Sequence, residues 1–128
     1  ERRLSVAIPA LFGAAGLMGY AFSMHAPVAA LAAITLAAAG MWSILGPFWA
    51  LSAAVLAPRG VAALAGGLAF VNSVGNLGGF CGPFIFGLIT EKTKSEQGGV
   101  VFLAVFVFLG ALTALSVRPA PVSEKAHA

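Results

Sequence analysis

Long apolar runs separated by short polar breaks dominate the pattern of this chain. The runs cover residues 4–22, 28–56, 60–90 and 99–117 and are rich in Ala, Leu, Val and Phe. Each is long enough to cross a hydrocarbon core of about 30 Å as an α-helix, whereas the strands of a transmembrane barrel would alternate over segments of about ten residues. The pattern predicts an all-α membrane protein with four transmembrane helices, followed by a short cytoplasmic tail over residues 118–128.

The composition supports a lipid bilayer as the surroundings of this chain and argues against several functions. Of the 128 residues 60% are hydrophobic and only 9% are charged, which is too apolar for one water-soluble core. The formal charge of +3 does not call for a nucleic-acid partner. The lone Cys81 excludes an intramolecular disulfide and a cysteine-based metal cage. Because no metal-ligand cluster, cofactor motif or converging catalytic group is present, we expect no enzyme, no metal and no cofactor.

The basic residues predict how the helices are oriented. Five of the 7 Lys and Arg residues lie on one side of a four-span arrangement, at Arg2, Arg3, Arg59, Arg118 and Lys125. Only Lys92 and Lys94 lie on the other side. The positive-inside rule therefore places both ends of the chain in the cytoplasm, as expected for a multi-pass protein of the inner (plasma) membrane.

The second apolar run contains a helix-breaking pair and two tryptophans. Pro47, next to Gly46, cannot donate the backbone hydrogen bond that the Ser43 carbonyl would accept, so a kink is expected. Trp42 and Trp49 lie seven positions apart and project from nearly the same helix face. An interfacial anchor is the usual role of a membrane tryptophan. The Gly-Pro break places at least one ring deeper, and Trp49 is our candidate cavity residue.

The third apolar run carries polar and small residues that sort onto separate helix faces at about 100° per residue. One face combines two amides with a glycine and a proline: Asn72, Asn76, Gly79 and Pro83. A neighbouring stripe consists of Gly75, Gly78 and Gly82, and large apolar side chains occupy the opposite side. The small-residue stripe favours close packing of another helix, and the amide face favours a polar cavity.

The two amides require partners, because burying an unpaired amide in apolar surroundings costs about 2–7 kcal/mol. Two interpretations remain open: Asn72 and Asn76 contact a ligand, or they hydrogen-bond adjacent helices and serve as structural links. Pro83 frees the carbonyl of Gly79 and predicts a flexible point just beyond the amides, suited to a gating hinge.

Two segments together resemble the anion:cation symporter family of the major facilitator superfamily. They are Gly46-Pro47-Phe48-Trp49-Ala50-Leu51 and Val71-Asn72-Ser73-Val74-Gly75-Asn76-Leu77-Gly78-Gly79-Phe80-Cys81-Gly82-Pro83. The resemblance covers nearly the whole chain and implies the ninth to twelfth helices of a twelve-helix transporter. Family members often have Pro where this chain has Ser52, a departure that softens one kink.

The resemblance implies ion-coupled symport, with a proton or sodium, of a small organic anion such as a carboxylate or sugar acid. By motif, Trp49 and Asn72 would contribute to the substrate cavity and Asn76 would line or brace it. Gly75, Gly79 and Pro83 would allow the helix to rock. The spans contain no Asp, Glu, Lys or Arg well inside them, so the coupling residues and the anion-binding cation are expected in a missing N-terminal half of the same chain.

The alternative is a small four-helix membrane protein with a structural or assembly role. In that case the glycine stripe would pack copies together, and the asparagines would serve assembly. The start at Glu1 rather than Met favours a longer chain. The coding sequence upstream of Glu1 distinguishes the two readings.

Overall fold

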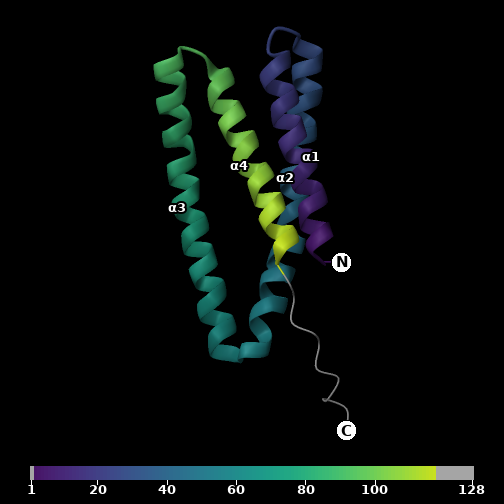
Figure 1. Ribbon diagram of the computed structural model, residues 1–128, viewed down its shortest axis with the longest axis vertical. Helices are drawn as coiled ribbons and strands as arrows, with labels where there is room; N and C mark the ends of the chain where they lie inside the picture. The colour runs from purple at the N-terminus through teal and green to yellow at the C-terminus, as the bar shows by residue number, and fades with distance from the viewer. Residues whose placement is uncertain (1, 118–128) are drawn as a thin grey trace.

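The computed structural model describes residues 2–117 and contains four long helices (Figure 1). They are α1 (Arg2–Ser23), α2 (Pro27–Leu56), α3 (Val61–Thr93) and α4 (Glu96–Ser116), with a short 3-10 turn, η1 (Ala57–Arg59), between α2 and α3. No strand occurs in this part of the chain, and all four helices are long and apolar enough to span a membrane. The predicted all-α membrane fold is confirmed. The expected tail, residues 118–128, lies outside the described residues.

The helix boundaries follow from local chemistry at each turn. Pro27 occupies the start of α2, where its missing N–H costs nothing. Gly60 precedes α3 with φ 97°, a conformation that residues with a Cβ rarely adopt. Before α4, Lys94 is left-handed at φ 54°, and the Ser95 hydroxyl accepts a hydrogen bond from the Gln97 N–H at 3.2 Å. These turn residues reverse the chain between antiparallel neighbours.

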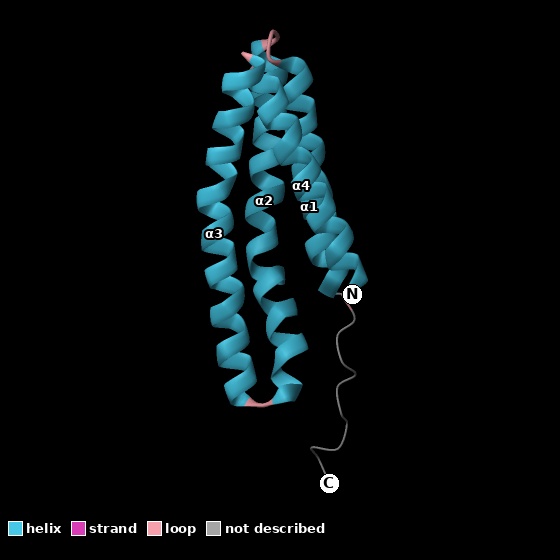
Figure 2. Ribbon diagram, turned by 60° about the vertical axis from the view of Figure 1, so that its left-hand side comes forward, coloured by secondary structure: helices cyan, strands magenta, loops and turns pink. Residues whose placement is uncertain are grey.

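The four helices differ in length, and this difference shapes the molecule. α2 and α3 contain 30 and 33 residues, against 22 in α1 and 21 in α4. At about 1.5 Å per residue the longer pair exceeds a hydrocarbon core of about 30 Å, so tilt or projection beyond it is required. Figure 2 shows α2 and α3 extending together well past the N-terminal end of α1. Both helices run without interruption through Pro47 and Pro83.

Close packing is concentrated between α1 and α2. A Cβ atom on Gly16 would lie 2.8 Å from the carbonyl oxygen of Ala33, and one on Gly40 would lie 2.6 Å from that of Pro9. Side chains at these positions would therefore collide with the backbone of the other helix. The glycines of the first apolar run allow the close approach that their spacing predicts.

The remaining core joins α4 to this helix pair. Leu17 and Ala21 of α1 form a buried cluster with Ala37 of α2 and with Val100 and Ala104 of α4. Small alanines at the centre let the three helices approach closely. α1, α2 and α4 thus form the compact part of the bundle.

The helix α3 is attached to this compact part mainly near its two ends. At its start, Gly67 faces the Leu56 side chain; toward its end, Phe86 covers Gly99 and Ile89 contacts Gly98. Between these contacts, residues 72–81 are all exposed. Figure 1 shows α3 close to α4 at one end and separated from it toward the other.

Candidate functional site

The predicted amide face lies on the unsupported middle of α3. Asn72 and Asn76 are both exposed, and neither amide hydrogen-bonds another group within residues 2–117. No hydrogen bond between these amides and another of the four described helices is formed, and the interpretation that they link adjacent helices stays a prediction for helices beyond these residues. The amides remain available to water, to a ligand or to protein beyond these residues.

The glycine stripe of α3 also lacks a neighbour among the described helices. Cβ atoms added at Gly75, Gly78, Gly79 or Gly82 would meet no atom within 4 Å. The expectation that another helix packs closely here is not met by α1, α2 or α4. The stripe and the amides together form one open polar surface on α3, which we call the α3 open face: Asn72, Gly75, Asn76, Gly78, Gly79 and Gly82.

The tryptophans of α2 have different surroundings. Trp49 is 37% exposed, and its ring meets Phe48 edge-on with centroids 5.4 Å apart. Trp42 is 75% exposed. A Cβ atom added to Gly46 would have no other atom within 4 Å, and the neighbouring Pro47 is half-buried. Trp49 is thus the better covered ring.

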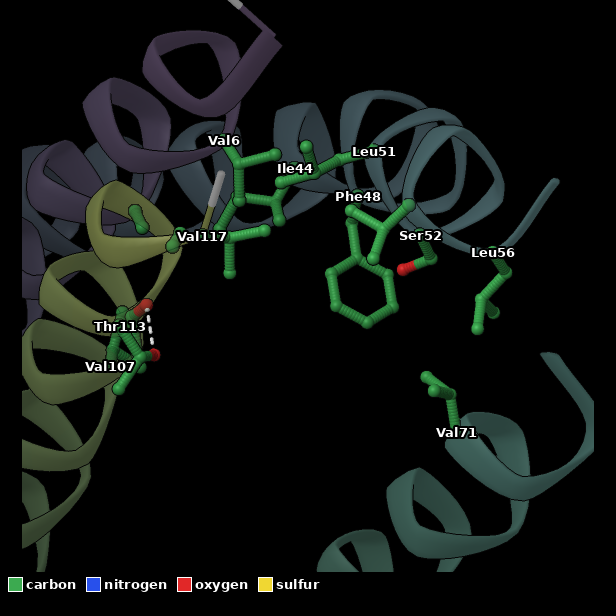
Figure 3. A pocket seen from close by; sticks show the side chains of 14 residues that line it. Val6, Ile44, Phe48, Leu51, Ser52, Leu56, Val71, Val107, Thr113 and Val117 are labelled. Atoms are coloured by element: carbon green, nitrogen blue, oxygen red, sulfur yellow. Dashed lines mark hydrogen bonds between the residues drawn. The ribbon is translucent and has the colours of Figure 1, made fainter. Parts of the chain in front are cut away.

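A cavity of about 550 Å³ opens between the four helices, as Figure 3 shows from close by. Its wall is almost entirely apolar. The lining residues are Val6 and Ala10 of α1, Ile44, Phe48, Leu51, Ser52, Val55 and Leu56 of α2, Val71 of α3, and Val107, Gly110, Thr113, Ala114 and Val117 of α4.

The predicted site residues do not line this cavity. Trp49 and Asn72 each follow a lining residue by one position, Phe48 and Val71 respectively, and so point about 100° away around their helices. Asn76 is also absent from the wall. The structure therefore does not bring Trp49 together with the two asparagines in a single pocket of the described chain.

The cavity contains two hydroxyl groups that the sequence motifs did not indicate. Ser52, the position where the motif departs from its usual Pro, lines the wall, and its hydroxyl has no hydrogen-bond partner within residues 2–117. Thr113, on α4, donates to the carbonyl of Gly110 at 2.8 Å, and both residues are in the wall (Figure 3). The spacing of Ile44, Phe48, Ser52 and Val55 along one helix face was the available signal.

Charged side chains with described positions lie only near the helix ends. Arg3 lies in the first turn of α1 and Arg59 ends the η1 turn, while the connection from α3 to α4 is surrounded by Glu91, Lys92, Lys94 and Glu96. The described residues contain no group of three or more His, Cys, Asp or Glu side chains that would hold a metal ion. Neither the cavity nor the α3 open face contains a charged residue.

Comparison with known proteins shows similarity to transporters. The chain is 37% identical over 122 residues to a putative tartrate transporter of Agrobacterium vitis, covering 94% of this chain and 26% of that protein. It is 39% identical over 87 residues to a quinolone resistance transporter of Acinetobacter baumannii, covering 68% of this chain and 19% of that protein. It is 31% identical over 118 residues to the inner membrane transport protein RhmT of Escherichia coli, covering 92% of this chain and 26% of that protein.

These matches identify the chain as a relative of membrane transporters, none of which is named as an enzyme. The similarity to the tartrate transporter and RhmT includes nearly the whole chain. The chain spans about a quarter of the length of these relatives. No protein-family model matches the chain. No solved structure matches it either.

Proposed function

We propose that this chain forms part of a secondary transporter that moves a small organic anion by alternating access, in symport with a cation, the proton being our first choice. The observation that carries the proposal is the similarity over 94% of the chain to a protein named as a putative tartrate transporter. Tartrate is a small carboxylate. A second Agrobacterium vitis protein with the same name is also 37% identical over 122 residues.

The position within the whole transporter is part of the proposal. The four helices would be the ninth to twelfth of a twelve-helix major facilitator of the anion:cation symporter family. Relatives about four times as long support this assignment, since four of twelve helices form a comparable share. The basic residues at the ends of the apolar runs support a cytoplasmic location of both chain ends. The similarity to RhmT supports the inner membrane.

The α3 open face is our candidate for the substrate-facing surface. Its two amides are free of protein partners within residues 2–117, and amides both donate and accept hydrogen bonds. A carboxylate that lost its hydration shell would need such donors. The adjacent glycines leave room for a ligand or for a moving helix to approach the backbone. Trp49 would contribute to the substrate path from α2. In the whole transporter, helices beyond this chain would complete the cavity between Trp49 and the two amides.

The coupling chemistry would come from residues beyond this chain. No Asp, Glu, Lys or Arg occurs over residues 4–58 or 60–90. Proton coupling requires a titratable group within the membrane, and anion binding favours a buried cation. The proposal therefore requires both groups in the rest of the transporter.

The first experiment extends the coding sequence upstream of Glu1 and then measures uptake. About eight further apolar spans with a buried arginine and a carboxylate would support the symporter. Proteoliposomes containing the full-length protein should then accumulate labelled tartrate when a proton gradient is applied, and an ionophore that dissipates the gradient should abolish accumulation. A start codon immediately upstream would overturn the proposal and favour a small four-helix protein with an assembly role.

A second candidate is export of a quinolone-type compound, favoured by the 39% identity to the Acinetobacter baumannii transporter. The direction of transport separates the two candidates. Cells that produce the full-length protein would accumulate less quinolone if it were an exporter. Unchanged quinolone accumulation together with tartrate uptake would eliminate this candidate.

A further inference from the structure

Asn72 and Asn76 lie one helical turn apart on the same face of α3. Both belong to the uninterrupted helix Val61–Thr93, in which their spacing corresponds to a rise of about 6 Å and a rotation of about 40° around the axis. Side chains with this spacing are neighbours, with Cβ atoms about 5–6 Å apart. The helix itself therefore sets the distance between the two amides, whatever other helices surround α3.

The surroundings of the two amides leave both of them open to one common ligand. Residues 72–81 are all exposed, and neither amide has a hydrogen-bond partner within residues 2–117. Cβ atoms added at Gly75 or Gly79, which lie beside the amides on the helix surface, would meet no atom within 4 Å. A ligand can thus lie along the α3 backbone and accept hydrogen bonds from both amides.

The separation of the amides determines which acceptors can bind both of them. The two oxygens of a single carboxylate lie about 2 Å apart, too close together to accept from both amides. In an extended four-carbon diacid the carboxylate carbons lie about 4 Å apart and their outer oxygens up to about 6 Å apart. The length of such a diacid therefore matches the rise of one helical turn.

We propose that Asn72 and Asn76 together select a short dicarboxylate, with one carboxylate on each amide and the carbon chain along α3 beside Gly75. This inference rests on the proposed function, because it takes the α3 open face as the substrate site, and it adds the class of organic anion that the site prefers. An N–H that donates to a carboxylate forms a charge-assisted hydrogen bond. Because such a bond corresponds to about tenfold or more in affinity, binding at two points favours the diacid over a monoacid.

A dicarboxylate also fits the pair of amides better than a monocarboxylate that carries hydroxyl groups. A hydroxyl at the right distance from the carboxylate could reach the second amide. It would be an uncharged acceptor, however, and hydrogen bonds to ionised acceptors are roughly twice as strong as those between neutral groups. No charged side chain occurs over residues 60–90, so α3 itself offers neither carboxylate a stronger partner than an amide.

The test compares the affinities of the purified full-length protein for succinate and butyrate by isothermal titration calorimetry. The two acids have the same number of carbons and differ in the second carboxylate. We expect succinate to bind about tenfold more tightly. Asn72→Ala and Asn76→Ala should each abolish this preference by weakening succinate binding alone, since butyrate needs only the amide that remains. Retained butyrate binding shows that each variant is folded.

A matched control and a displaced amide make the test specific for distance. Ser73→Ala should leave the preference unchanged, because the Ser73 hydroxyl already donates to the Ala69 carbonyl at 2.9 Å. Gly79 lies about 10 Å along the axis from Asn72 on the same face, and a Cβ there meets no atom within 4 Å. Gly79→Asn combined with Asn76→Ala should therefore transfer the preference to suberate, whose carboxylate carbons lie about 9 Å apart.

Several results would overturn the inference. Equal binding of succinate and butyrate, or binding of neither, would remove the selection of diacids. A loss of affinity by the same factor for both acids in Asn76→Ala is the result expected of a link between helices. A preference for succinate that persists after the amide is moved would show that other residues set the length. Tartrate uptake together with equal binding of the two acids would leave the proposed function intact and remove only the inference. Selective succinate binding without gradient-driven uptake would do the reverse.

Discussion

A Cβ atom on Gly40 of α2 would lie 2.6 Å from the carbonyl oxygen of Pro9 in α1. This is closer than a real Cβ approaches an oxygen, so the two backbones meet only because Gly40 has no side chain. On the other helix, a Cβ atom on Gly16 of α1 would lie 2.8 Å from the carbonyl oxygen of Ala33 in α2. Glycines on both partners bring α1 and α2 into contact, and this pair, with α4, supports the more open α3.

Replacing Gly40 by alanine should therefore destabilise the bundle. We expect Gly40→Ala to cost about 1–3 kcal/mol, the usual penalty for overpacking, because the added methyl group has no space to enter. Gly46→Ala on the same helix is the control, because a Cβ atom at that position would have no other atom within 4 Å. Thermal unfolding of the detergent-solubilised protein measures the difference. Equal stability of the two variants would contradict the close contact between α1 and α2.

The free amide of Asn72 leads to a prediction about transport. Asn72→Leu in the full-length protein should lower kcat/KM for tartrate uptake about tenfold or more, the loss of roughly one good hydrogen bond to the substrate, without lowering expression. Ser73→Ala is the control, since the Ser73 hydroxyl is satisfied by the Ala69 carbonyl of its own helix at 2.9 Å. Normal uptake by Asn72→Leu would remove this residue from the site.

The unequal exposure of the two tryptophans distinguishes their roles. Trp49 is half as exposed as Trp42 and contacts Phe48 edge-on. If Trp49 faces the substrate path, Trp49→Ala should reduce uptake by several-fold, whereas Trp42→Ala, which removes a ring that is 75% exposed, should leave uptake near normal. Initial uptake rates at matched expression compare them. Equal effects of both variants would mean that the rings act only as membrane anchors.

Helix number and approximate boundaries could be predicted from the sequence because long apolar runs have few alternatives in a membrane. The predicted 60–90 and the observed α3, Val61–Thr93, differ mainly at the polar end. There the helix continues through Glu91 and Lys92, since a helical backbone needs no apolar side chain to form. The left-handed Lys94 and the Ser95 cap, rather than the end of hydrophobicity, mark the boundary.

Packing partners could not be predicted in the same way. Glycine spacing looks similar in the first and third apolar runs, yet Gly16 is tightly covered and Gly78 faces open space. A small side chain permits close approach, but the opposing surface decides whether it occurs. The predicted site residues differ from the cavity wall by one helical position: Phe48 and Val71 line the cavity, whereas the neighbouring Trp49 and Asn72 do not.

The Ser95 cap should contribute measurably to the turn between α3 and α4. Its hydroxyl accepts from the Gln97 N–H at 3.2 Å, and the Thr93 hydroxyl donates to the Ser95 carbonyl at 3.0 Å. Ser95→Ala should destabilise the protein by about 1 kcal/mol through loss of the cap. Ser116→Ala removes only a bond to a carbonyl of its own helix and should be nearly neutral. Unfolding by a denaturing detergent compares the two variants.

The proposed orientation predicts which turns can be labelled from outside the cell. Glu91→Cys, in the last turn of α3, should react with a membrane-impermeant maleimide in intact cells, because this end is assigned to the outer side. Pro58→Cys, in η1, should react only after permeabilisation. Both positions are exposed, so access to the reagent depends on the membrane rather than on burial. A cysteine-free background is needed because Cys81 is itself exposed. Labelling of Pro58→Cys in intact cells would reverse the orientation and, with it, the location of Arg3 and Arg59 at the cytoplasmic surface.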